Sequence, residues 1–265
     1  MLVHGYNNER LDVLGSYRTI DAQMRLLGFL GAASRPYDAL VGFAWPGGAT
    51  GVSFPFARGR ADDTAPRFGR LLADLRGCGA TVDLNTHSLG AHVAFEALRE
   101  ASSQVVRNAW NFASAVDNES VEQGERYFDA SRQSACFYVF HSKNDPVLRV
   151  WYSGPEDPRA IIDHSQLVTV INCKDVVTSH GGYRSSGQVW SFMAQELTSP
   201  TNEQFVTLKK TPEALTAVFR ATGGSFRAAA TYCKASVAGR ESEASVTTAG
   251  LGERALKQLT YFLGV

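Results

Sequence analysis

The segment from Thr81 to Phe95 constrains the fold of this chain more than any other part of the sequence. A short run typical of a β-strand, residues 81–86, ends at His87-Ser88-Leu89-Gly90, and a helical pattern begins at once. A serine between a buried strand and a helix N-terminus is the arrangement of a nucleophile elbow, usually written G-x-S-x-G. The helix N-terminus directs backbone N–H groups to a place where negative charge can develop. Thr86 replaces the first glycine of the pattern, so the prediction depends on the strand before Ser88 and the helix after it.

An acid that orients a catalytic base is expected on a loop after a later strand. Residues 137–141 read as a buried strand, and Asp145 lies in the turn-rich loop that follows. Asp117, after the preceding strand at 105–112, is the alternative. The better strand pattern favours Asp145.

The base is expected after the last strand of the sheet. Residues 167–171 read as that strand, and the loop after it contains His180. The alternative, His164, precedes the strand and would lie at the wrong end, because a base must reach the carboxyl edge where the serine lies. The sequence therefore predicts His180 as the base.

With these parts in this order, the chain resembles an α/β-hydrolase of the esterase or lipase type over about residues 1–197. The resemblance is carried by the His4-Gly5-Tyr6-Asn7 opening, the Trp45-Pro46 pair and the His87-Ser88-Leu89-Gly90 elbow, which look most like a bacterial branch of that family. It implies an oxyanion hole formed by the backbone N–H groups of Tyr6 and Leu89. His87 and Trp45 are the candidate substrate-binding residues.

The alternation of strand and helix patterns predicts an α/β protein with about six mostly parallel strands and helices on both faces, and the resemblance implies that this is the α/β-hydrolase fold. Met1 lies inside the first predicted strand, so either the fold has a minimal N-terminus or the reading frame begins upstream. The expected helices cover about residues 13–33, 63–76, 118–131 and 188–197. The stretches 48–60 and 146–160 are expected to be loops near the pocket.

From residue 198 the character of the sequence changes, which predicts a catalytic domain over 1–197 and a C-terminal extension over 198–265. The extension is expected to be partly helical, with a helix start at Thr211-Pro212 and an amphipathic helix over 252–263. Its role stays open between a cap, an oligomerisation segment and a partly disordered tail.

The 26 basic and 26 acidic residues balance, which gives no electrostatic case for nucleic acid or an anionic membrane as a partner. The four cysteines have no paired spacing, and the six histidines lie on separate elements without an H-E-x-x-H pattern, so neither a metal nor another cofactor is expected. No stretch reads as a signal peptide or membrane span, so a cytoplasmic location is expected.

These features predict a serine hydrolase that cleaves carboxylic esters through Ser88, His180 and Asp145, with an acyl-enzyme intermediate and a small-molecule ester as its partner. Aromatic residues and few charges in the pocket loops favour small to medium apolar acyl groups. Thioester or amide cleavage would use the same residues. The alternative from another class is a non-catalytic binding module with the same fold.

Overall fold

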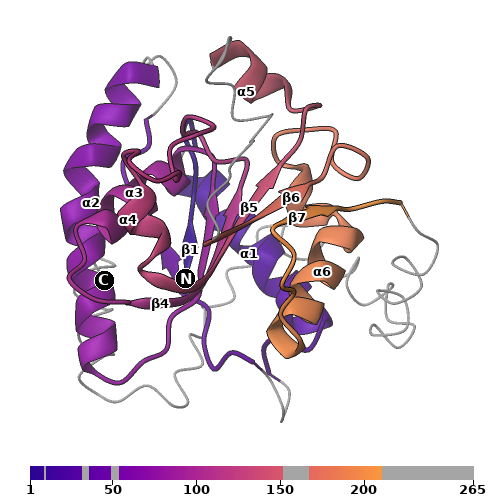
Figure 1. Cartoon of the computed structure of the whole chain (residues 1–265), viewed down its shortest axis with the longest axis horizontal. Helices are drawn as coiled ribbons and strands as arrows, with labels where there is room; N and C mark the ends of the chain where they lie inside the picture. Colours follow the sequence, from indigo (N-terminus) through magenta and orange to yellow (C-terminus); the bar gives the residue numbers. More distant parts are fainter. Residues whose placement is uncertain (9, 32–35, 49–53, 152–166, 211–265) are drawn as a thin grey trace.

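The protein is represented by a computed structural model that describes residues 1–8, 10–31, 36–48, 54–151 and 167–210 (Figure 1). Within these residues, seven parallel strands form one sheet in the order β2-β1-β3-β4-β5-β6-β7, and helices cover both of its faces. The predicted α/β architecture is confirmed. The expected number of about six strands is corrected to seven.

The strands that were expected from the sequence are present, and several are short. They are β1 (Leu2–Val3), β2 (Gly42–Phe43), β3 (Leu84–His87), β4 (Val106–Phe112), β5 (Ser134–His141) and β6 (Val168–Asn172). The seventh, β7 (Phe205–Thr207), pairs with β6 at the edge of the sheet. Because all pairings are parallel, the carboxyl ends of β1, β3, β5 and β6 share one edge, and polar loops follow each of them.

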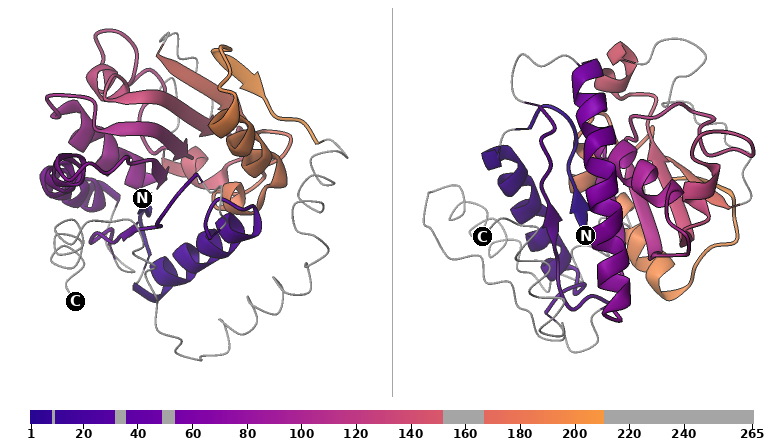
Figure 2. Two further views of the ribbon diagram at one scale, coloured as in Figure 1. Left: turned by 90° about the horizontal axis from the view of Figure 1, so that it is seen from below. Right: turned by 90° about the vertical axis from the view of Figure 1, so that its left-hand side faces the viewer.

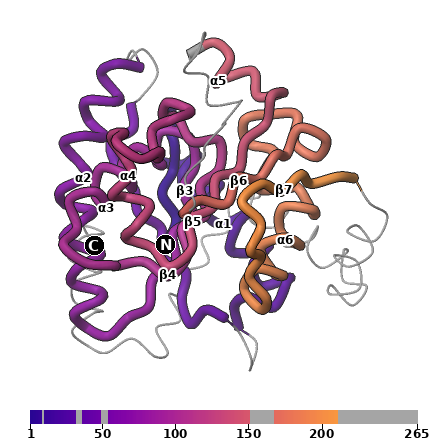
Figure 3. Tube along the Cα trace, in the orientation of Figure 1, coloured from indigo at the N-terminus to yellow at the C-terminus, as the bar shows by residue number. Residues whose placement is uncertain are grey.

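The helices form two layers around the sheet (Figure 2). On one face lie α1 (Arg10–Leu26) and α6 (Gly187–Thr198), where Phe29, just after α1, contacts Trp190 of α6. The other face carries α2 (Phe54–Gly77), α3 (Leu89–Arg99) and α4 (Phe128–Ser131), which lie side by side in Figure 3. Two short helical turns, α5 (Pro146–Trp151) and the 3-10 helix η2 (Gly182–Ser185), follow β5 and β6.

Four expected element boundaries are corrected by the structure. The expected loop 146–160 begins with a short helix, α5. The expected loop 48–60 is helical from Phe54 onward, and α2 accommodates Pro66 in its interior. The polar segment 118–131 consists mostly of turns and is helical only over α4, because it has too few apolar residues to pack a longer helix. The first helix runs over 10–26 and not over 13–33. The predicted helices at Thr211 and at 252–263 lie outside the described residues.

The helix that follows Ser88 is buried on every side. All residues of α3 from Leu89 to Leu98 are buried between α2 and the sheet, and all of them except His92 and Glu96 are apolar or glycine. Phe68, Leu71 and Leu72 of α2 pack into the same core. The backbone on which Ser88 lies is therefore fixed by close packing.

Candidate active site

Ser88 occupies the turn between β3 and α3 in a strained backbone conformation. Its φ of 56° and ψ of −127° lie in a region that residues other than glycine rarely adopt. The turn is held by hydrogen bonds from the N–H of Ser88 to the carbonyl of Phe112 (2.9 Å) and from the N–H of Ala115 to the carbonyl of Ser88 (3.2 Å). Leu89 is the first residue of α3, so its N–H has no acceptor within the helix.

Two glycines are needed because the chain segments around Ser88 lie very close together. A β-carbon on Gly90 would lie 2.6 Å from the carbonyl oxygen of Val3 and still closer to that of His4. A β-carbon on Gly5 would lie 2.7 Å from Cβ of Ser88. The opening segment of the chain therefore lies directly against the elbow.

The departure from glycine at Thr86 has a local explanation. Thr86 is fully buried, and its hydroxyl donates to the side-chain oxygen of Asn111 on β4 (2.8 Å). Asn111 in turn donates to the carbonyl of Tyr138 on β5 (3.0 Å). A threonine is accommodated here because its one polar group has a buried partner.

Asp145 and His180 are in direct contact. Nδ1 of His180 lies 2.7 Å from Oδ2 of Asp145, whose side chain is completely buried, whereas the His180 side chain is 17% exposed. The other carboxylate oxygen accepts the backbone N–H groups of Val147 (2.9 Å) and Leu148 (3.1 Å) at the start of α5. Asp145 is thus both the partner of His180 and the N-terminal cap of a short helix.

His87 links the elbow to the loop that carries His180. Nε2 of His87 lies 2.8 Å from the carbonyl oxygen of His180, and the two imidazole rings are 4.7 Å apart between centroids. Burial, followed by the nearby charges of His180 and Arg184, lowers the pKa of His87 well below its usual value. His87 is therefore neutral at pH 7.

Trp45 packs against the predicted oxyanion loop and hydrogen-bonds to it through His4. The ring of His4 stacks on Trp45, with 5.5 Å between centroids. Nε2 of His4 accepts the backbone N–H of Trp45 (3.0 Å), so Nδ1 carries the proton and donates to the carbonyl of Gly5 (2.9 Å). The indole N–H of Trp45 donates to the carbonyl of His4 (2.7 Å). Trp45 is buried beneath the loop that leads to Tyr6.

Some residues considered as candidates from the sequence are not found beside Asp145 and His180. Asp145, and not Asp117, supplies the carboxylate that contacts His180, while His164 lies outside the described residues. Arg184, four residues after His180, also reaches the group but was not identified from the sequence. Its Nη2 lies 3.3 Å from Nδ1 of His87, and no short motif signals a contact between residues so far apart in the chain.

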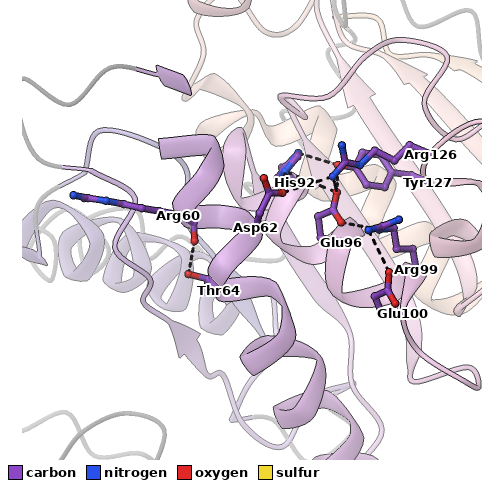
Figure 4. A network of polar contacts seen from close by, with 9 residues as sticks. All are labelled: Arg60, Asp62, Thr64, His92, Glu96, Arg99, Glu100, Arg126 and Tyr127. Atoms are coloured by element: carbon purple, nitrogen blue, oxygen red, sulfur yellow. Dashed lines mark hydrogen bonds and ion pairs between the residues drawn. The ribbon is translucent and has the colours of Figure 1, made fainter. Parts of the chain in front are cut away.

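A second polar cluster lies on the side of α3 that faces α2 (Figure 4). Asp62, His92 and Glu96 bring three possible metal-ligand atoms within 4.8 Å of one another. However, the oxygens of Glu96 already accept the Tyr127 hydroxyl (2.7 Å) and ion-pair with Arg99 and Arg126. A metal ion would have to displace these groups. The cluster is a hydrogen-bonded network that joins α2, α3 and the segment before α4.

Comparison with known proteins identifies one family. Residues 1–153 match the family described as "Alpha/beta hydrolase of unknown function (DUF900)", which is more than half of the chain. No curated protein and no solved structure matches the chain in the other two comparisons. The matched segment includes the opening loop, the elbow and Asp145, and it ends before His180.

Proposed function

The chain belongs to the alpha/beta hydrolases, and on that premise we propose that it is a serine hydrolase that cleaves carboxylic esters. The observation that carries the proposal is the 2.7 Å contact between Asp145 and His180, at the same edge of the sheet as the strained elbow of Ser88. In this contact, Nδ1–H of His180 donates to Asp145. The lone pair of Nε2 is then available to accept a proton.

The reaction proceeds in two halves. His180 takes the proton from Ser88 Oγ as the oxygen attacks the carbonyl carbon of the ester, and the resulting oxyanion accepts hydrogen bonds from the backbone N–H groups of Tyr6 and Leu89. His180 then gives the proton to the leaving alcohol, which leaves an acyl group on Ser88. A water molecule, deprotonated by His180, attacks the acyl carbon, the bond from this carbon to Ser88 Oγ breaks, and His180 returns the proton to Oγ as the acid leaves.

Exposed apolar side chains at the carboxyl edge of the sheet favour an ester with an apolar acyl group, and we propose that this group is small to medium in size. Leu11 (80% exposed), Phe56 (73%) and Val150 (70%) lie on α1, α2 and α5, three helices that follow the carboxyl ends of strands. Apolar surface near a site favours apolar ligands.

None of the helices in the described ranges is long and apolar enough to cross a membrane.

The proposal is tested with p-nitrophenyl esters from acetate to long acyl chains, measured on the wild type and on Ser88→Ala. We expect turnover of the acetate and butyrate esters that depends on Ser88, and a rate that falls for long chains. Rates that rise steadily toward long chains would contradict the proposed acyl size. A matched thioester and anilide series separates esterase from thioesterase and amidase activity.

A non-catalytic binding module is the second candidate, because a fold does not fix a function. It predicts equal, near-background hydrolysis by the wild type and by Ser88→Ala. The contact between Asp145 and His180 favours the hydrolase, since a binding module has no need for a buried carboxylate paired with a partly exposed imidazole.

A further inference from the structure

Arg184 connects three parts of the fold that meet beside Ser88. It lies in η2, one turn after His180, and its Nη1 donates to the hydroxyl of Ser16 on α1. Its Nη2 lies 3.3 Å from Nδ1 of His87 on the elbow. The backbone of Arg184 is fixed as well, because the indole N–H of Trp190 on α6 donates to its carbonyl oxygen (2.8 Å).

The two contacts of His87 require the same protonation state of the ring. A guanidinium can only donate hydrogen bonds, so Nδ1 of His87 must accept from Arg184. A carbonyl oxygen can only accept, so Nε2 must carry the proton that it donates to the carbonyl of His180. Both bonds exist together only for a neutral His87 with its proton on Nε2. The lowered pKa of His87 agrees with this state.

Among the described residues, no carboxylate forms an ion pair with the Arg184 guanidinium. Its polar side-chain contacts within this part of the chain are the neutral Ser16 and His87. Burial accordingly lowers the pKa of Arg184. Since burial of a cation is unfavourable unless it is paired, the hydrogen bonds of Arg184 to Ser16 and His87 are the described contacts that offset this cost.

We propose that Arg184 is a positioning residue that, through His87, holds the backbone of His180 in place for the reaction. The inference rests on the proposed serine-hydrolase function. Asp145 fixes the imidazole of His180 at Nδ1, and His87 fixes its carbonyl oxygen. The orientation of His180 toward the elbow is then set at two points, and the second point depends on the donor from Arg184.

The kinetic test compares Arg184→Met, which keeps the aliphatic length but has no donor, with Arg184→Lys, which keeps a charged donor. Arg70→Met is the matched control, because Arg70 is exposed on α2. With p-nitrophenyl butyrate we expect kcat of Arg184→Met to fall about ten- to hundredfold, as misplaced catalytic groups do, with KM nearly unchanged. Arg184→Lys should recover part of the loss, and Arg70→Met should behave as the wild type.

A spectroscopic test has a wild-type part that does not depend on any variant folding, and a second part that compares the wild type with Arg184→Met. In protein labelled with 15N at histidine, the wild type should show His87 as a neutral ring with its proton on Nε2 from pH 8 to pH 6. In Arg184→Met, His87 should titrate at a higher pH than in the wild type, because a nearby positive charge has been removed.

The outcomes separate this inference from the function on which it rests. An inactive wild type whose Ser88 does not react with a fluorophosphonate would refute the hydrolase function. An active wild type with an unchanged kcat in Arg184→Met would refute the positioning role alone. So would a kcat in Arg184→Lys as low as in Arg184→Met, or a wild-type His87 that is charged or protonated on Nδ1 at pH 6.

Discussion

Gly5 faces Ser88 so closely that a β-carbon on Gly5 would lie 2.7 Å from Cβ of Ser88 and 3.0 Å from the carbonyl oxygen of His87. The loop that is proposed to stabilise the oxyanion can therefore contact the proposed nucleophile only because Gly5 has no side chain. The proposed role of the backbone N–H groups of Tyr6 and Leu89 as oxyanion donors requires these segments to lie this close together.

Replacing Gly5 with alanine should push the opening loop away from the elbow. We expect ester hydrolysis to fall at least tenfold, since a misplaced oxyanion donor costs on the order of tenfold to a thousandfold in kcat. Gly15→Ala is the matched control, because nothing lies within 4 Å of a β-carbon at that exposed helical position. The control should keep full activity and gain about 0.5–1 kcal/mol of unfolding free energy. Full activity in Gly5→Ala would contradict the proposed role of the opening loop in stabilising the oxyanion.

The contact of Asp145 with His180 and its role as the cap of α5 can be tested separately. In Asp145→Asn, the remaining oxygen can still accept from Val147 and Leu148, but the amide cannot accept the Nδ1 proton of His180. We expect kcat to fall by roughly 10³–10⁴ with little change in the melting temperature. Asp145→Ala should lose the cap as well and unfold more easily by about 1 kcal/mol. If Asp145→Asn were as active as the wild type, Asp145 would not be the acid.

The strained backbone of Ser88 should lower the stability of the folded protein although the serine is needed for activity. Its positive φ is more easily adopted by glycine than by any other residue. We expect Ser88→Gly to be inactive, and to be more stable than the equally inactive Ser88→Ala by about 1 kcal/mol, the scale of strain at such positions. Chemical denaturation of the two variants measures the difference. A more stable alanine variant would show that the elbow is not strained.

Stability should fall as the pH is lowered from 7 to 5. Burial is the main reason that the pKa values of His4, His87 and His92 lie below the ordinary 6.5 in the folded protein. The unfolded chain therefore binds these protons first, and the unfolding free energy decreases as the pH drops below 6.5. The slope approaches about 1.4 kcal/mol per pH unit for each imidazole that stays neutral. A flat or rising profile in urea denaturation over this range would exclude the effect.

The Tyr127 hydroxyl should matter for stability and not for catalysis. It lies 2.7 Å from Oε1 of Glu96 and 2.9 Å from Nδ1 of His92, both buried (Figure 4). Tyr127→Phe leaves these groups short of a partner, and we expect a loss of about 1–3 kcal/mol in unfolding free energy. Esterase activity at 25 °C should stay within twofold of the wild type. A large loss of kcat in the folded variant would show that this network contributes to catalysis.

Much of the site could be predicted because it follows local rules. Ser88, Asp145 and His180 each lie in a loop directly after a strand, and the strands leading to them have clear β-patterns. The order of these loops along the chain, together with the parallel sheet, brings them to one edge. The choice of Asp145 over Asp117 followed from the stronger strand before it, and the contact with His180 agrees with that choice.

What could not be predicted depends on contacts between distant residues. Arg184 reaches His87 across nearly a hundred positions, and no periodicity or motif records such a contact. The strand β7 has only three residues and is stabilised by pairing with β6, which a local pattern does not show. The start of α2 at Phe54 was missed because glycines and aromatics before it read as a loop, and tertiary packing decided the boundary.

Covalent labelling tests the central claim most directly. The wild type, Ser88→Ala and His180→Gln are treated with a fluorophosphonate, and the adduct is located by mass spectrometry. An activated serine should give one adduct per chain on the peptide that contains Ser88, none with Ser88→Ala, and much slower labelling with His180→Gln. A folded wild type that gives no adduct, or an adduct that persists in Ser88→Ala, would contradict the assignment of Ser88 as the nucleophile.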